Sequence, residues 1–304
     1  MDIKNASYYM KNISEALAVV YSDEQLCQQY AWWMLQALCE KTKIDLLVED
    51  TLMLSDEQKS LLAMWIKLLV DQHMPIQYIL GSVPFNDLDI LVQPPTLIPR
   101  PETEEWCLHI IEHLMLLDNK KITILDLATG SGCIALALAY HVPQAEVVAT
   151  DIADTALALA EQNIEHTIIR NVTLIKSDLF DAIPVGMLFD IIVSNPPYIA
   201  QSEWFSLDAT VTKWEDHEAL VAADDGLAII KKIIKSAPQF IKKNDEMKNK
   251  QIPQIVIEIG YQQGDIVKQL MQDAGYNDVL VQKDLEKKDR FVVGRVDYVA
   301  DSRS

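Results

Sequence analysis

Residues 122–133 have the sequence ITILDLATGSGC, and the apolar segment Ile134–Tyr140 follows directly. The apolar run predicts a buried strand, the small residues predict a turn, and the segment after them predicts a helix. A strand, a small-residue turn and a helix in this order are typical of the first βαβ unit of a nucleotide-binding sheet. Because the turn lacks the full G-x-G-x-x-G spacing, a dinucleotide is not favoured. The stretch therefore predicts an α/β fold built on a parallel sheet.

Two further strands are expected after this unit, and acidic residues stand at or near their ends. Ala145–Thr150 leads into Asp151, about twenty residues beyond the turn, where a carboxylate can bind both hydroxyls of a ribose. Val172–Ile175 ends near Asp178, which can accept a hydrogen bond from an adenine amine, and one residue of the pair Leu179-Phe180 can pack on the base. Single acids of this kind are common in solvated turns, but after successive strands they favour a ribonucleoside site.

A proline-rich motif, Asn195-Pro196-Pro197-Tyr198, follows the apolar run Phe189–Val193. The run predicts another short buried strand, so the motif is expected at a strand end, where open α/β sheets bind ligands. The two prolines stiffen the loop. The Asn195 side-chain oxygen and the Pro196 carbonyl can accept both hydrogens of a planar NH2 group, with the Tyr198 ring against the attached π system. A proline-stiffened turn with a tyrosine lid explains the motif alone equally well.

Length and composition limit the class of protein. The chain has 304 residues, enough for two domains, and a net charge of −19. It shows no apolar run long enough to span a bilayer and no signal-peptide core, so we expect a cytoplasmic protein without membrane contact. The negative charge opposes direct nucleic-acid binding, because phosphate contacts require Lys or Arg. The four cysteines lack metal-ligand spacing and are expected to be buried thiols.

The N-terminal part of the chain is expected to be helical, with Ser22 and Ser55 as candidate N-caps. Apolar residues at three- and four-residue spacing predict helices over 13–21, 24–41 and 55–72. Prolines then disfavour helix between Pro75 and Pro101, where Tyr78–Leu80 and Asp89–Val92 are expected to pair as a short hairpin. We therefore expect a helical domain over 1–74, of a kind that usually serves recognition, a linker over 75–98, an α/β domain over 99–296 and a tail over 297–304.

The linker ends in the sequence LIPRPETE at residues 97–104, where Thr103 and its neighbouring acids suit the start of a helix running to about Leu117. This helix contains HIIEH at residues 109–113, which matches an H-x-x-E-H metal pattern. Without an evident third ligand, the two histidines are expected to share an ordinary helix face, and no metal is expected.

The C-terminal third of the chain completes the sheet. We expect a helix over 226–240, a polar excursion over 242–251, a buried strand over 255–259 that contains Glu258, a helix over 264–274 capped by Gly275, and a final strand pair over 278–282 and 291–295.

These motifs, in this order, resemble S-adenosylmethionine-dependent methyltransferases that act on planar nitrogens. Adding five segments, the whole chain resembles the HemK/PrmC family over nearly its full length: Pro99–Glu104, Tyr78–Gly81 with Phe85, Gly260–Gly264, Lys283–Leu285 and Asp289-Arg290. That family methylates the side-chain amide of the glutamine in the Gly-Gly-Gln motif of peptide chain release factors. The resemblance implies a seven-stranded Rossmann-like class I sheet with its last strand antiparallel, behind a small helical domain that docks the release factor.

The resemblance also implies the ligands and the residues that bind them. S-adenosylmethionine is the expected cofactor, S-adenosylhomocysteine the product, and a monomer without a metal the expected state. The residues expected to bind the cofactor are Ala128, Thr129, Gly130, Gly132, Asp151, Asp178, Leu179 and Asn195. The residues expected to act in catalysis are Asn195, Pro196, Pro197 and Tyr198, and Arg100 and Glu102 join them in binding the substrate.

Two positions depart from the family pattern, and three alternative functions stay open. Ala128 stands where the family usually has Gly, which is tolerable if its φ is negative, and Asp216 stands where the family usually has Pro. A related enzyme can methylate a glutamine of a ribosomal protein, and a nucleic-acid amino methyltransferase uses a similar Asn-Pro-Pro-Tyr pocket but would be expected to carry a basic face. A non-catalytic binding protein is disfavoured by the intact motif at Asn195–Tyr198.

Overall fold

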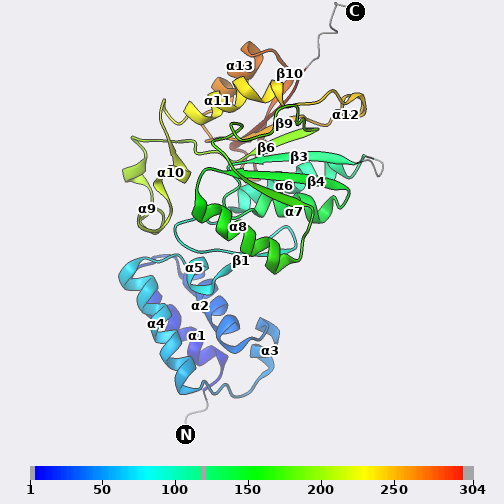
Figure 1. Ribbon diagram of the computed structural model, residues 1–304. Coiled ribbons are helices and arrows are strands. Elements are labelled where there is room, and N and C mark those ends of the chain that lie inside the picture. The colour runs from blue at the N-terminus through cyan, green and yellow to red at the C-terminus, as the bar shows by residue number, and fades with distance from the viewer. Residues whose placement is uncertain (1–3, 118–120, 297–304) are drawn as a thin grey trace, which may run out of the picture. The chain divides into compact units, whose positions relative to one another are not determined.

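The computed structural model describes residues 4–117 and 121–296, and the expected tail over 297–304 lies outside them (Figure 1). The chain divides into two compact units. Among the described residues, the first unit comprises 4–81 together with 208–214, and the second comprises 82–117, 121–207 and 215–296. Among the described residues, no helix has the length and apolar character that crossing a membrane requires.

The first unit is helical and has its own apolar core, which includes Ile13, Leu35 and Leu69. Its helices are α1 (Ala6–Leu17), α2 (Glu24–Cys39), α3 (Lys43–Val48), α4 (Asp56–Gln72), α5 (Ile76–Leu80) and α9 (Ala209–Trp214). The Trp214 indole donates a hydrogen bond to the Gln72 carbonyl at 3.1 Å, which ties α9 to the end of α4. An apolar core therefore holds this unit together, as amphipathic helices require.

Side-chain caps decide where three helices of the first unit begin. Ser55 is the N-cap of α4, as expected, and forms a capping box with Gln58. The cap of α2 is Asp23, whose carboxylate accepts hydrogen bonds from two backbone N–H groups, so the expected cap at Ser22 is wrong. The first helix begins at Ala6 and not at residue 13, because Asn5 caps it through its side chain.

The expected hairpin is shifted along the chain. Tyr78–Leu80 is the end of helix α5, because Pro75 can stand at a helix start and Gly81, with φ of 87°, ends the helix in the left-handed region. The true hairpin pairs β1 (Ser82–Phe85) with β2 (Leu88–Leu91). The two residues between them both have positive φ, which is typical of a two-residue hairpin turn.

The second unit is built on the expected seven-stranded sheet, in the order β10-β11-β9-β6-β3-β4-β5. The strands are β3 (Ile122–Leu127), β4 (Ala145–Asp151), β5 (Val172–Lys176), β6 (Ile191–Ser194), β9 (Ile255–Glu258), β10 (Tyr276–Lys283) and β11 (Asp289–Val296). β11 runs antiparallel to both of its neighbours, while β9, β6, β3, β4 and β5 are parallel to one another. The fold class predicted from the sequence is therefore confirmed.

Helices and short strands complete the second unit (Figure 1). The helices are α6 (Pro101–Leu114), α7 (Cys133–His141), α8 (Asp154–Thr167), α10 (His217–Leu220), α11 (Ala228–Ser236), α12 (Asp245–Asn249) and α13 (Gly264–Asp273). The polar excursion over 242–251 contains α12, a short helix capped by the Asn244 side chain, which the sequence reading missed. A two-stranded pair, β7 (Ile199–Ala200) with β8 (Val221–Ala222), continues the chain beyond the Asn195–Tyr198 motif. One apolar cluster joins strands of the sheet to α11 and α13 through residues such as Ile192, Ile233 and Val267.

Candidate active site

A cavity of about 390 Å³ lies at the carboxyl ends of the parallel strands. Four neighbouring strands each bring a residue to its wall: Gly130 after β3, Asp151 at the end of β4, Asp178 after β5 and Asn195 after β6. The volume lies in the range of pockets for small ligands. The position is where an open α/β sheet binds its ligand, because the strand order reverses at this point.

The turn after β3 is held in an unusual backbone conformation. Ala128, Gly130 and Gly132 have φ of 57°, 57° and 82°. A side chain at Gly132 would place its Cβ 3.2 Å from the Cβ of Ala160 in α8, which explains a glycine there. An alanine is free of backbone strain here only if its φ is negative, and the φ of Ala128 is positive. The left-handed conformation costs about 1 kcal/mol for such a residue.

Asp151 joins two turns at the cavity wall. One carboxylate oxygen accepts a hydrogen bond from the Gly130 N–H at 2.9 Å, and the other accepts from the Ala153 N–H at 2.9 Å. Burial raises the pKa of this carboxyl, and these two N–H donors oppose the shift. Each oxygen keeps a second lone pair, so the carboxylate can still accept hydrogen bonds from a pair of hydroxyl groups.

Asp126 lies behind the turn and is fully buried. Thr129 donates a hydrogen bond from Oγ1 to Asp126 Oδ2 at 2.6 Å, and within the described residues Oδ1 has no hydrogen-bond partner. Burial raises the pKa of Asp126 to about 7. Thr129 and Gly132 do not line the cavity, and their contacts shape the turn. Their direct contact with a cofactor stays a prediction.

Of the pair expected to pack on a base, Leu179 lines the cavity and Phe180 does not. The Phe180 ring is buried and stacks on Phe240, with ring centroids 4.7 Å apart. Asp178 lines the cavity beside Lys232, whose Nζ is 3.9 Å from its carboxylate.

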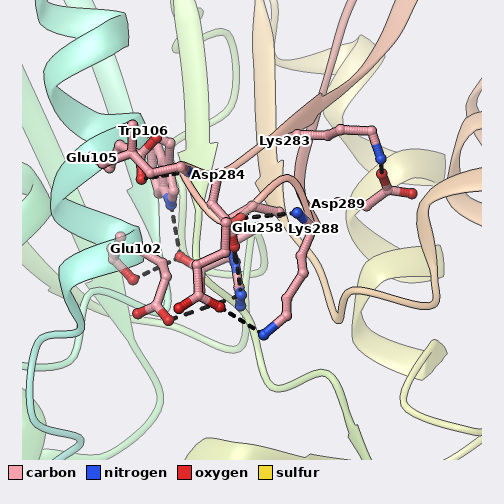
Figure 2. Close-up of polar contacts among 12 residues, drawn as sticks. Glu102, Glu105, Trp106, Glu258, Lys283, Asp284, Lys288 and Asp289 are labelled. Atoms are coloured by element: carbon pink, nitrogen blue, oxygen red, sulfur yellow. Dashed lines mark hydrogen bonds and ion pairs between the residues drawn. The ribbon is translucent and has the colours of Figure 1, made fainter.

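The Asn195–Tyr198 loop is held by hydrogen bonds that converge on Glu258 in strand β9. The Asn195 amide Nδ2 donates to Thr103 Oγ1 at 3.2 Å, and Thr103 donates to Glu258 Oε2 at 2.7 Å. Trp106 donates from Nε1 to the same oxygen at 2.7 Å, and Figure 2 shows its ring extending from α6 toward Glu258. Tyr198 donates from its hydroxyl to Oε1 at 3.3 Å. Burial raises the pKa of Glu258, while the hydrogen bonds from Trp106 and Thr103 oppose that shift.

The two expected substrate-binding residues in the PRPETE segment do not line the cavity. The Arg100 guanidinium donates to both carboxylate oxygens of Glu215, at 2.7 and 2.6 Å, and the Glu215 side chain is only 1% exposed. Glu102 is partly exposed, and its carboxylate lies 3.9 Å from an Arg290 nitrogen. Arg100 therefore anchors the segment that begins at Glu215, and its contact with a substrate stays a prediction, as does that of Glu102.

The segment after Glu215 forms a part of the cavity wall that was not predicted from the sequence. The wall residues in this part of the chain are Asp216, Glu218, Ala219, Val221, Ala222 and Ala223. The Asp216 N–H donates to the Pro95 carbonyl at 2.8 Å, a bond that the family's usual proline could not make. These residues belong to no motif that marks a ligand site, and only the folded chain brings them to the strand ends. Glu258 could have been identified from the sequence by one feature, since it is an acidic residue inside an otherwise apolar strand.

The histidine pair on α6 has an ordinary environment. The His113 ring nitrogen Nδ1 lies 2.8 Å from the His109 carbonyl oxygen, and the two rings are in edge contact with centroids 4.4 Å apart. Over residues 4–117 and 121–296, no group of three or more His, Cys, Asp or Glu side chains could hold a metal ion.

Comparisons with known proteins agree with this geometry. Residues 109–213 match the model of the methyltransferase small domain, and residues 10–81 match that of the PrmC N-terminal domain. Among solved structures, the hMettl16 catalytic domain superposes with a TM-score of 0.52 at 16% identity, covering 89% of this chain and 91% of that one, which bears on the fold alone. The match to a methyltransferase domain model over the strands that carry the cavity identifies the chain as a methyltransferase.

Curated relatives narrow the class. The release factor glutamine methyltransferase of Flavobacterium psychrophilum is 34% identical over 96% of this chain and 98% of its own length. That of Lactococcus lactis subsp. lactis is 38% identical over 87% of this chain and 92% of its own. The chain belongs to the release factor glutamine methyltransferase family.

Proposed function

We propose that this protein transfers a methyl group from S-adenosylmethionine to the side-chain amide nitrogen of the glutamine in the Gly-Gly-Gln motif of peptide chain release factors, and so tunes translation termination. The observation that carries the proposal is the Asn195–Tyr198 loop, which brings Asn195 to the wall of the cavity. Full-length relatives that carry the name of this activity support it.

The cavity fits the cofactor in its chemistry. The Asp151 carboxylate offers free lone pairs to the ribose hydroxyls, and the Asp178 carboxylate can accept from the adenine amine. Leu179 and Ile152 supply apolar surface for the base, and Gly130 lets the backbone approach closely. When bound, S-adenosylmethionine supplies a methyl group on a sulfonium, which is a strong leaving group.

The residues of the Asn195–Tyr198 loop position the amide. The Asn195 side-chain oxygen and the Pro196 carbonyl accept the two hydrogens of the substrate NH2, so the nitrogen is held in one orientation. Polarising both N–H bonds raises electron density on the nitrogen and stabilises the charge that develops there. The Tyr198 ring lies against the planar amide. No general base is needed before an in-line transfer. The amide nitrogen gains the methyl group as the carbon–sulfur bond breaks, S-adenosylhomocysteine is the leaving group, and the nitrogen then loses one of its two protons to water.

The helical first unit is proposed to dock the release factor away from the glutamine loop. Its match to the PrmC N-terminal domain over residues 10–81 supports this role. We propose further that the protein acts as a cytoplasmic monomer without direct nucleic-acid contact, in keeping with its net charge of −19.

The test is mass spectrometry of a purified release factor after incubation with the protein and S-adenosylmethionine. One added methyl on the Gly-Gly-Gln glutamine, lost with Asn195→Ala, is the expected result. Asn195→Ala should reduce turnover far more than cofactor affinity measured by calorimetry, and Asp151→Ala should do the reverse. Cofactor binding without methylation of the release factor would instead direct the search to a ribosomal protein or a nucleic acid.

A further inference from the structure

Three residues form a chain of hydrogen bonds that ends at the proposed substrate pocket. Glu258 accepts from Thr103, and Thr103 accepts from Asn195, over donor–acceptor distances of 2.7 and 3.2 Å. We call these three residues the Glu258 relay. Glu258 and Thr103 are 1% and 2% exposed, so water does not compete for their hydrogen bonds.

The direction of the relay is decided at Glu258 Oε2. The indole N–H of Trp106 only donates, and it lies 2.7 Å from this oxygen, so Oε2 must be an acceptor. An ionised carboxylate meets this condition. A protonated one also meets it, because the Trp106 N–H that points at Oε2 disfavours a proton there and favours one on Oε1, near the Tyr198 hydroxyl. Oε2 therefore accepts in both protonation states.

The direction then passes through Thr103 to Asn195. A threonine hydroxyl has a single hydrogen, and Thr103 donates it to Glu258 Oε2. Thr103 consequently faces Asn195 with a lone pair, which can be satisfied only by the NH2 end of the Asn195 amide. The carbonyl end of the same amide is left for the substrate.

The consequence for recognition is chemical. With the Asn195 oxygen turned outward, the proposed amide pocket has two acceptors, that oxygen and the Pro196 carbonyl proposed above to join it. Two acceptors suit an NH2 group and repel a carboxylate, because a buried polar group facing a like partner is left unsatisfied. An inverted Asn195 would present one donor and one acceptor, and the distinction between glutamine and glutamate would weaken.

We propose that Thr103 and Glu258 are positioning residues that hold the Asn195 amide in the orientation selective for a glutamine side chain. The inference rests on the proposed function for its substrate. Glu258 also binds the Tyr198 hydroxyl, so one carboxylate orients both polar side chains of the loop.

The experiment compares Thr103→Val with Thr103→Ser. Valine has nearly the shape of threonine but lacks the hydroxyl, and serine keeps it. Thr103→Val should lower kcat for release factor methylation about tenfold, the factor for one ordinary hydrogen bond, while the Kd for S-adenosylmethionine stays close to the wild-type value. Thr103→Ser should restore most of the lost turnover.

The variant Glu258→Gln separates the direction of the hydrogen bonds in the relay from the negative charge of Glu258. The glutamine oxygen can accept from both Trp106 and Thr103, so the relay keeps its direction although the negative charge is gone. We expect this variant to be more active than Thr103→Val. If it is as inactive as Thr103→Val while still folded, charge and not orientation is what matters, and the proposal is overturned.

A readout independent of activity separates this inference from the proposed function. In protein labelled with ¹⁵N-asparagine, the side-chain NH2 resonance of Asn195, assigned through Asn195→Ala, should move in Thr103→Val and keep its position in Thr103→Ser. This result would uphold the relay even if no release factor were methylated. An Asn195 resonance that is the same in all three proteins would refute the relay, and wild-type kcat in Thr103→Val would refute its role in catalysis.

Discussion

Gly226 provides a test of how rigidly the Asn195–Tyr198 loop must be held. Its φ is 82°, and a Cβ at this position would lie 2.0 Å from the Tyr198 carbonyl oxygen and 2.8 Å from Gln263 Nε2. The same carbonyl accepts a hydrogen bond from Gln263 Nε2 at 3.0 Å. Gly226→Ala therefore pushes directly on the backbone of the motif.

The size of the effect follows from these distances. A Cβ almost never approaches another atom closer than 3.0 Å, so the Tyr198 carbonyl must move by about 1 Å from the 2.0 Å position. A displacement of this size at reacting groups costs on the order of 100-fold in rate. Separately, alanine at this φ costs about 1 kcal/mol in stability.

Gly186→Ala is the matched control, because Gly186 has φ of 83° and open space where its Cβ would be. Both variants should lose about 1 kcal/mol in denaturant unfolding from backbone strain alone. Only Gly226→Ala should also lose about 100-fold in kcat in the release factor assay. If Gly226→Ala turns over like Gly186→Ala while folded, the loop tolerates displacement, and positioning by this backbone contact is refuted.

Three further substitutions test the turn, the buried acid and the ion pair. Ala128→Gly should raise the free energy of unfolding by roughly 0.5–1 kcal/mol in urea titrations, because the strain removed at φ of 57° outweighs the entropy that glycine adds to the unfolded state. Asp126→Asn should become more stable relative to the wild type as pH rises from 4 to 7. The pKa of Asp126 in the folded protein, about 7, exceeds the ordinary value of 3.8, so the wild type loses up to about 4 kcal/mol of stability across that range. A difference in free energy of unfolding that does not change with pH would contradict the raised pKa. Arg100→Met should cost about 3 kcal/mol by leaving the buried Glu215 carboxylate unpaired, and adding Glu215→Gln should recover most of it in thermal unfolding; no recovery would contradict the ion-pair explanation.

The sheet could be predicted because its signal is local. Each central strand is a short apolar run that ends at a small, acidic or proline-containing turn, and a parallel sheet places all these ends at one edge. Asp151, Asp178 and Asn195 stand after three such runs, so their convergence on one cavity followed from topology alone.

Other features depend on contacts between distant parts of the chain. Thr103 and Glu258 are 155 positions apart, and no sequence motif predicts the hydrogen bond between them. Two helices were predicted incorrectly for a different reason. Asn5 caps α1 earlier than the apolar periodicity indicates. The segment Ile76–Leu80 forms a short helix that ends at Gly81, where apolar residues alone had predicted a strand.

The buried acids of the site fix the orientation of its hydrogen-bond donors but lower the stability of the fold. Asp126, Asp151 and Glu258 all have pKa values raised by burial, so each opposes folding at neutral pH. Apolar packing could fill the same space with greater stability, but it is not directional, whereas a carboxylate oxygen fixes the N–H and O–H groups that point at it. Amide substitutions should therefore stabilise the fold at these positions in proportion to burial. Activity should survive only where the remaining oxygen still accepts from the donors that set the orientation of the loop, as it can at Glu258 from Trp106 and Thr103.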